Sequence, residues 1–168
     1  MNKKLHVPPD IPGDAELKNV PTLAEIGLEH FAPYLMNRIT NRWNSDLIEV
    51  LRRYGLTTRQ MRTLAVLSTK DGCSINELAT LAVTEQSTMS RALVGMEEKG
   101  YVERKARSAD ARFNEIHLTE KGRRTFEEFW PAMYWHFRRL FHGIDEHEFN
   151  DFVATLHRVL KNIRRQPF

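Results

Sequence analysis

The sequence lacks the features that several classes of protein require. Its one cysteine, Cys73, cannot form an intramolecular disulfide or a cysteine-based zinc site. The longest uninterrupted aliphatic stretch, Leu64–Leu67, is far shorter than the roughly 18 apolar residues of a membrane span. The first nine residues contain no apolar segment of about 7 to 15 residues, which a secretory signal needs. We therefore expect a cytoplasmic protein.

Motifs for catalysis and for metal binding are missing as well. The eight glycines form neither of the phosphate-binding loops G-x-G-x-x-G and G-x-x-x-x-G-K, and no nucleophile–base set is present. His136, His142 and His147 gather near Glu146 and Glu148, but no two of these histidines have the i, i+4 spacing that suits a shared metal. We expect no enzyme, no metal site and no cofactor.

The composition is that of an ordinary globular protein, and its charge is unevenly distributed. Hydrophobic residues make up 41% and charged residues 28%, which is enough apolar mass for a core. The net charge is only +3. Residues 56–124 carry 12 basic and 9 acidic side chains, whereas residues 125–168 carry 6 of each. This pattern indicates a central part that faces a polyanion and a terminal part that packs.

Local signals predict the first helices. Residues 1–30 contain four prolines and are expected to form an extended arm with one helical turn near Leu23–Leu28. Apolar residues at spacings of three and four predict a long amphipathic helix over residues 31–55. Two capping boxes, Thr57 to Gln60 and Ser74 to Glu77, predict the next two helices. Cys73 occupies the staple position of the second box, so we assign it a structural role and expect no redox sensing.

Later signals predict a hairpin between helices. Thr84 is expected to cap a helix that runs to about Lys99. The apolar period then changes from 3.6 to 2, which predicts strands over 101–105 and 113–118 and a polar tip over 107–112. Thr119 and the capping box from Asp145 to Glu148 predict two further long helices.

These elements predict a mainly α fold with a small β-hairpin wing (α+β), a winged helix-turn-helix with long terminal dimerisation helices. The order helix, tight turn, helix, hairpin is typical of that motif. We expect an N-terminal arm over 1–30, a winged helix-turn-helix DNA-binding domain over 56–119, and a helical dimerisation region formed by 31–55 and 120–168. The terminal helices carry more large apolar residues than one small winged domain covers, which favours a homodimer, although packing among these helices accounts for part of the stripe.

The helix after Thr84 has the pattern of a recognition helix. Met89, Ala92, Leu93 and Met96 share one face, so Ser87, Arg91, Val94 and Glu98 are predicted to point the other way. Arg91 suits the O6 and N7 atoms of guanine, and Gln86 suits adenine. The expected DNA contacts on and before this helix are Thr84, Gln86, Ser87, Thr88, Ser90 and Arg91.

The hairpin tip is predicted to reach the minor groove. Arg107 and Arg112 are basic, and Asp110 is placed to orient Arg112 through a charge-assisted pair. A basic tip that is merely solvated is the alternative. Its position directly after a recognition helix favours the DNA contact.

Five motifs in this region resemble those of one family. The segments 56–60 (LTTRQ), 86–91 (QSTMSR), 97–104 (EEKGYVER), 110–112 (DAR) and 118–122 (LTEKG) are similar in order and separation to the MarR family of transcriptional regulators. The resemblance implies an obligate homodimer with interlocked terminal helices, double-stranded DNA with a pseudo-palindromic operator as partner, and a ligand cleft between the dimerisation and DNA-binding parts.

By the same resemblance, individual residues acquire expected roles. Ser87, Ser90 and Arg91 match recognition-helix positions, and Asp110 and Arg112 match the Asp-x-Arg of the wing. These are the residues on which we expect DNA binding to depend.

An effector site is predicted on the first long helix. His30, Tyr34, Arg38 and Trp43 offer aromatic and cationic groups for a small molecule such as an aromatic carboxylate. The alternative is that Trp43 belongs to the core and Arg38 to a surface ion pair, and for any single residue this alternative is slightly favoured.

The sequence thus predicts a sequence-specific, ligand-responsive homodimeric repressor. The rival hypothesis is a winged-helix dimer that acts as a protein-interaction module without specific DNA binding, for which the mild net charge argues. Salt dependence separates the two, because contacts to DNA phosphates release counterions.

Overall fold

The computed structural model describes residues 20–107 and 110–163, and for residues 107–113 it describes the backbone of the strands but not the side chains. The chain divides into two compact units, residues 1–42 and 43–168, with the boundary inside the long helix α2 (Ala32–Arg53).

The first unit contains two short helical turns and the beginning of α2. Thr22 caps α1 (Leu23–Ile26) and forms a capping box with Glu25, and a 3-10 turn, η2 (Leu28–His30), follows. The extended arm that the sequence predicts over residues 1–30 falls mostly outside the described residues. Where it is described, it contains these two turns.

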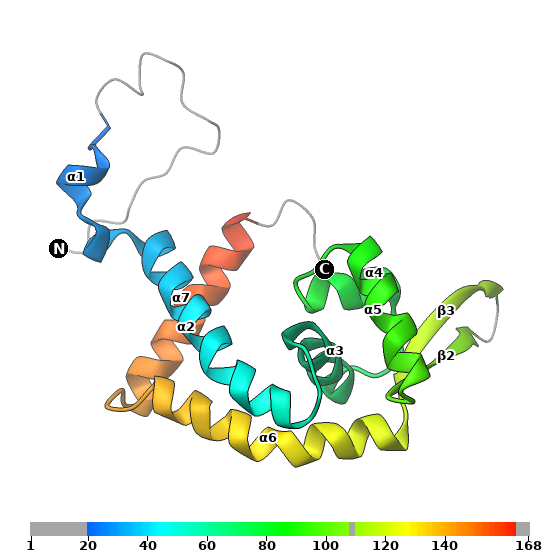
Figure 1. Cartoon of the computed structure of the whole chain (residues 1–168). Coiled ribbons are helices and arrows are strands. Elements are labelled where there is room, and N and C mark those ends of the chain that lie inside the picture. Colours follow the sequence, from blue (N-terminus) through cyan, green and yellow to red (C-terminus); the bar gives the residue numbers. More distant parts are fainter. Residues whose placement is uncertain (1–19, 108–109, 164–168) are drawn as a thin grey trace. The chain divides into compact units, whose positions relative to one another are not determined.

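The second unit holds the helix-turn-helix. Its helices are α3 (Thr58–Thr69), α4 (Ile75–Leu81) and α5 (Gln86–Glu98). Both predicted capping boxes are confirmed. The Thr57 side chain accepts a hydrogen bond from the Gln60 amide, and Ser74 does the same for Glu77. Figure 1 shows these three helices beside the β-hairpin.

The sheet has three antiparallel strands in the order β1-β3-β2, not only the predicted hairpin. The strands are β1 (Cys73–Ser74), β2 (Val102–Arg107) and β3 (Asp110–Leu118). Strand β1 has two residues, too few to leave a periodic signal in the sequence. The hairpin strands also extend further than predicted, because Arg107 pairs with Asp110 and the ladder continues to the tip.

Two long helices complete the second unit. Helix α6 (Glu120–Leu140) begins at the base of the hairpin, with Thr119 as its cap, and α7 (Glu146–Ile163) follows a short turn. The predicted capping box at Asp145 is confirmed, since the Glu148 amide donates to Asp145 Oδ1 at 2.9 Å and the Glu148 carboxylate accepts from the Asp145 amide. No helix within the described ranges is long and apolar enough to cross a membrane.

The core lies under the helix-turn-helix and joins it to α6. Residues from α2, α3, α4, α5, the sheet and α6 form one cluster, and its largest fully buried side chain is Phe129. At the corner where α6 leaves the sheet, Gly122 comes so close to the backbone that a Cβ there would clash with the Tyr101 carbonyl oxygen. The base of the hairpin and the start of α6 are therefore packed backbone to backbone.

Candidate nucleic-acid interface

The turn before α5 differs from the prediction at Thr84. The cap of α5 is Glu85, whose side chain makes no capping hydrogen bond, and Thr84 lies two residues ahead of the helix. The Thr84 amide donates to Ala79 O at 2.9 Å and the Val83 amide donates to Thr80 O at 3.2 Å. This is the pattern of a Schellman motif that closes α4. The prediction of Thr84 as the cap of α5 was wrong because the Thr84 backbone takes part in the hydrogen bonds that end α4.

The two faces of α5 are divided as predicted. Met89, Leu93 and Met96 are fully buried. The outward residues Ser87, Arg91, Val94 and Glu98 are exposed. On the flanks, Gln86 is exposed and Ser90 is half-buried, as is Thr88. The N-terminal part of this face carries amide, hydroxyl and guanidinium groups, which are the groups that read base edges and phosphates in the major groove.

Arg91 lies back along its own helix. Its Nε donates to Ser87 O at 3.3 Å, and its Nη2 donates to Thr88 Oγ1 at 3.4 Å. Both bonds are long and solvent-exposed, so they hold the guanidinium near the N-terminal end of α5 without a strong partner to displace. The guanidinium therefore remains available to a ligand at that end.

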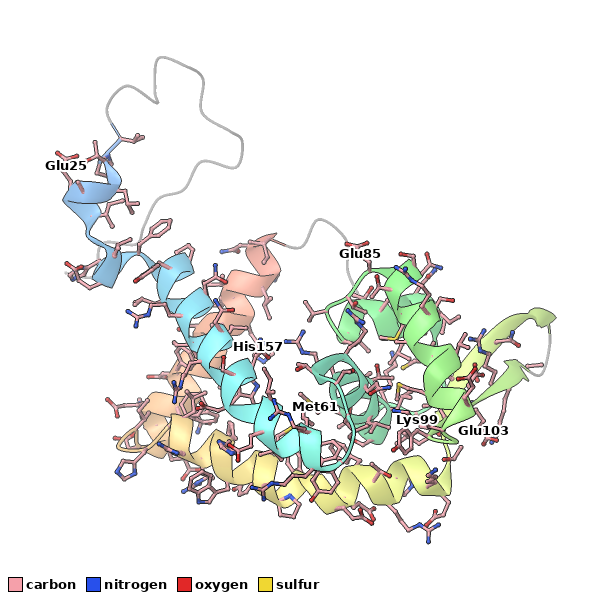
Figure 2. All side chains as sticks on the ribbon, viewed as in Figure 1. Glu25, Met61, Glu85, Lys99, Glu103 and His157 are labelled. Atoms are coloured by element: carbon pink, nitrogen blue, oxygen red, sulfur yellow. The ribbon has the colours of Figure 1, made fainter. Side chains whose placement is uncertain are left out.

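The C-terminal end of α5 is fixed to its surroundings by charged side chains. Arg104 Nε on β2 donates to Glu97 Oε1 at 2.9 Å, and Lys99 Nζ donates to Gly55 O at 3.4 Å. Figure 2 labels Glu85 and Lys99 at opposite ends of α5. The contacts leave the N-terminal end of the helix outward-facing while the other end is held to the hairpin and to the α2–α3 loop.

The predicted wing residues lie on the two strands of the hairpin. Arg107 is the last residue of β2, and Asp110 and Arg112 belong to β3. Their side chains lie outside the described atoms, so the expected pair between Asp110 and Arg112 stays a prediction.

The base of the wing is joined to the loop after α3. The Asp71 carboxylate accepts a hydrogen bond from the Leu118 amide at 2.9 Å and lies 3.0 Å from His117 Nδ1. Burial works against ionisation of Asp71, but these two hydrogen bonds and the nearby charges of His117 and Arg123 hold the pKa of its carboxyl below the ordinary value. The ionised carboxylate thus fixes strand β3 to the helix-turn-helix.

Cys73 has the structural role that the sequence predicts. It is fully buried, and its Sγ lies 3.2 Å from Lys70 O. Burial raises the pKa of the thiol and outweighs the nearby charge of Lys70, which favours the thiolate. A buried thiol with a raised pKa is a poor redox sensor. Among the described residues, no group of histidine, cysteine and carboxylate side chains suits a metal ion.

The predicted effector residues belong to different parts of the chain. In the first unit, Arg38 stacks over the Tyr34 ring at 5.8 Å and its Nη1 lies 3.5 Å from the Tyr34 hydroxyl. His30 Nδ1 lies 3.7 Å from Glu29 Oε1. In the second unit, Trp43 packs half-buried against the core cluster. Tyr34 and Arg38 are therefore adjacent, while Trp43 serves the core.

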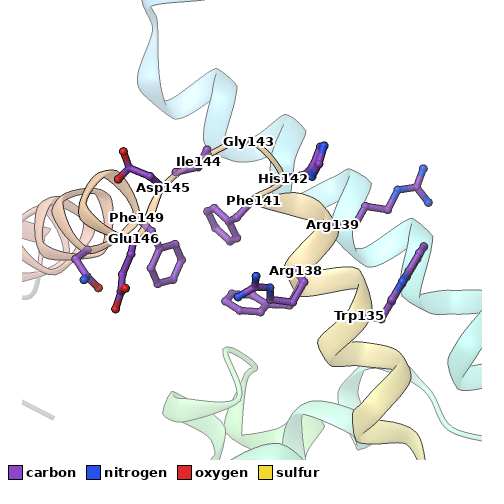
Figure 3. A pocket seen from close by; sticks show the side chains of 12 residues that line it. Trp135, Arg138, Arg139, Phe141, His142, Gly143, Ile144, Asp145, Glu146 and Phe149 are labelled. Carbon is purple, nitrogen blue, oxygen red and sulfur yellow. The ribbon is translucent and has the colours of Figure 1, made fainter.

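A hollow of about 880 Å³ lies at the turn between α6 and α7. Figure 3 shows its walls, in which the rings of Phe141 and Phe149 meet beside Arg138, whereas the Arg139 side chain points away from the two rings. The two rings lie edge to face at 4.9 Å between centroids. No residue of this hollow was among the predicted effector residues. The sequence signal for it is the break at Gly143 between two aromatic stripes.

Comparison with known proteins identifies the family of this arrangement. The MarR family model matches residues 54–112, which span the helix-turn-helix and most of the hairpin. A solved transcriptional regulator of the MarR family from Silicibacter pomeroyi is 46% identical, covers 88% of this chain and 100% of its own, and superposes with a TM-score of 0.83. This chain belongs to the MarR family of transcriptional regulators. The membership assigns it to regulators rather than to enzymes.

Activities are known for two proteins that this chain resembles less closely. The transcriptional repressor IacR of Pseudomonas putida is 27% identical over 141 residues, which cover 84% of this chain and 82% of IacR. CouR of Rhodococcus jostii was solved with p-coumaroyl-CoA, and the CouR repressor was also solved on a 23-mer DNA duplex. These two structures are 21% and 22% identical, with TM-scores of 0.71 and 0.70, and each covers 84% of this chain and 99% of its own. At that identity they show a shared fold.

Proposed function

We propose that this MarR-family regulator is a homodimeric repressor that binds a pseudo-palindromic operator and releases it when a small molecule binds. The observation that carries the DNA part is the exposed, hydroxylated and basic N-terminal end of α5, opposite a fully buried apolar face. A recognition helix needs that division of faces, because its inner side holds the domain together and its outer side meets base edges. The proposed DNA contacts are those of the sequence analysis: Thr84, Gln86, Ser87, Thr88, Ser90 and Arg91 on and before α5, and Arg107, Asp110 and Arg112 at the wing.

The homodimer is supported by the apolar surface of the terminal helices. No residue of α7 is buried, although the helix carries an apolar stripe. Phe152, Leu160 and Ile163 are exposed there, as are Trp130 and Tyr134 on α6. Several large apolar side chains left exposed on two long helices favour an interface. A second copy with two-fold symmetry brings two recognition helices about 34 Å apart, one turn of DNA.

The ligand response is supported by two relatives and by one pair of residues in this chain. IacR is a repressor, and CouR binds an aromatic acyl thioester. In this chain, the adjacent Tyr34 and Arg38 offer a ring and a cation for an aromatic carboxylate. An effector that favours a spacing of the winged domains unsuited to consecutive grooves lowers DNA affinity by the coupling energy, typically about 1 to 3 kcal/mol. Because its proposed partner is DNA, we propose that the protein is located in the cytoplasm.

The test begins with purified protein and a pool of random duplex DNA. Several rounds of selection are expected to enrich a palindrome, and titration of that site across salt is expected to give a steep negative slope of log affinity against log salt. A flat slope without an enriched motif contradicts the proposal and favours the protein-interaction module. The enriched site then serves to screen aromatic carboxylates for release of DNA.

The dimer is tested in parallel by sedimentation. Leu160→Asp places a charge in the apolar stripe of α7 and is expected to give a monomer with weakened operator binding. Ala154→Asp, on the opposite side of the same helix, is the matched control and is expected to remain a dimer. If both variants sediment like the wild type, another surface forms the dimer.

A further inference from the structure

One apolar side chain stands within the outward face of α5. Ser87, Arg91, Val94 and Glu98 follow one another at spacings of four, three and four, so they form a single exposed row, here called the outer row. Val94 is 50% exposed, and it stands between Arg91 and Glu98 in the row. The row thus presents a hydroxyl, a cation, an isopropyl group and an anion in that order.

The stability of the chain itself does not account for Val94. Valine is a weaker helix former than alanine, leucine or lysine, because branching at Cβ restricts its rotamers. Half of its surface is left in water, so burial offsets little of that cost. Single exposed apolar residues are common on protein surfaces. What distinguishes Val94 is its place in the outer row, one helical turn from Arg91.

We propose that Val94 contacts the C5-methyl group of a thymine and so specifies a T·A pair beside the base that Arg91 reads. The inference rests on the proposed operator binding. In the major groove, the thymine methyl is the apolar feature that a base pair offers, and short apolar side chains are the groups that recognise it. Val94 is thereby a specificity-determining residue of the recognition helix.

Helix geometry places that thymine. Three residues separate Arg91 from Val94, which corresponds to about 4.5 Å along the helix axis. Successive base pairs are about 3.4 Å apart. With α5 lying along the major groove, we expect the thymine one or two base pairs from the base read by Arg91, on the side toward the C-terminal end of α5.

The experiment removes one methyl group at a time from the DNA. Each thymine in one half-site of the selected operator is replaced by deoxyuridine, which keeps the hydrogen-bonding groups and lacks only the C5-methyl. At one position, the wild type is expected to lose about four-fold in affinity, the loss that about 0.8 kcal/mol for one buried methyl group produces. Val94→Ala is expected to bind the thymine and deoxyuridine sites equally well at that position.

Two further variants make the result specific. Val94→Thr retains one of the two methyl groups and is expected to keep part of the discrimination. Val83→Ala removes a more exposed valine that lies before α5 and outside the outer row, and it is expected to discriminate like the wild type. Helix content by circular dichroism checks that each variant is folded.

Two results overturn the inference while leaving operator binding intact. One is a wild type that binds every deoxyuridine operator as well as the original. The other is a Val94→Ala variant that keeps the full loss at the sensitive thymine, which assigns the methyl contact to another residue. If no operator is enriched from random DNA, the proposed function itself fails and the inference fails with it.

Discussion

Arg104 on the wing strand β2 and Glu97 on the recognition helix α5 are joined by a hydrogen-bonded ion pair of 2.9 Å between Nε and Oε1. The two side chains are 31% and 29% exposed. Arg124 and Glu120, by contrast, form a pair of 3.7 Å with both side chains mostly in water. The Arg104 pair is thus the better shielded of the two, and it links the two elements that we expect to enter neighbouring grooves of DNA.

Removing this link is expected to loosen the wing. Arg104→Met keeps the aliphatic stem and should lower the free energy of unfolding by about 1 kcal/mol. It should also weaken DNA binding, because the wing is no longer held at a fixed angle to α5. Urea denaturation of Arg104→Met, Glu97→Gln and the double variant measures the coupling between the two residues.

The exposed pair on α6 provides the control for that cycle. Arg124→Met is expected to change the free energy of unfolding by less than about 0.5 kcal/mol, as surface pairs do. Equal effects of Arg104→Met and Arg124→Met, together with zero coupling between Arg104 and Glu97, would show that the pair does not position the wing.

Arg91 is expected to read one base of the operator. Arg91→Ala should cost about 1 to 3 kcal/mol of binding free energy on the selected site and relax the preference at one base pair. Fluorescence anisotropy on a panel of single-base operator variants measures both effects. Arg158→Ala, which removes an arginine from α7, is the matched control and should leave base preference unchanged. An Arg91→Ala variant with the same preference as the wild type would exclude a reading role.

Most of the helix starts could be predicted because capping boxes are local. Thr57, Ser74 and Asp145 each bond within three residues, so the sequence contains the whole interaction. The prediction that Thr84 caps α5 was wrong because the interactions that decide this turn come from two helices. Two helix ends compete for the residues between Leu81 and Gln86, and the backbone bonds that close α4 decide the outcome.

In the candidate site, too, features set by local sequence were predicted and features set by tertiary contacts were not. The outward face of α5 follows from a period of 3.6 residues and was predicted, with Val94 as one of its members. The link between Arg104 and Glu97 depends on the register of β2 against β3 and on the angle of α5, so the sequence alone does not reveal it. The two-residue strand β1 was missed because only its pairing with β3 makes it a strand.

Val83 is expected to be a site of stored backbone strain. Its φ of 54° is the one left-handed value at a non-glycine residue in the described part of the chain, and its side chain is 78% exposed. Val83→Gly should therefore raise the free energy of unfolding by about 1 kcal/mol, since an L-residue pays about 1–2 kcal/mol for this conformation. Such a gain corresponds to a rise of about 2 to 4 °C in Tm, which calorimetry resolves.

The same substitution elsewhere should have the opposite sign. Val94→Gly replaces a valine inside α5, where glycine costs up to about 1 kcal/mol relative to good helix formers, and it should lower Tm. A lower Tm for Val83→Gly as well would mean that contacts of the Val83 side chain, rather than strain, dominate at that position.

The last prediction concerns acid stability and the loop after α3. Asp71 has a pKa below its ordinary value of 3.8 in the folded protein, because its hydrogen bonds from the Leu118 amide and His117, with nearby charge, outweigh the burial that opposes ionisation. A folded-state pKa below the unfolded one means that the unfolded chain binds the proton first. The stabilisation is therefore complete above the ordinary value and is lost as the pH falls through 3.8 toward the folded-state pKa.

Asp71→Asn removes this proton-linked stabilisation while keeping an acceptor for the Leu118 amide. At pH 7 the variant should be less stable than the wild type, and its free energy of unfolding should fall less steeply with pH below about 5. Urea denaturation at a series of pH values measures both. Asp151→Asn on α7 is the control for the loss of one negative charge. Parallel pH profiles for the wild type and Asp71→Asn would contradict the assigned role, because the stabilisation depends on the ionised carboxylate at the base of the wing.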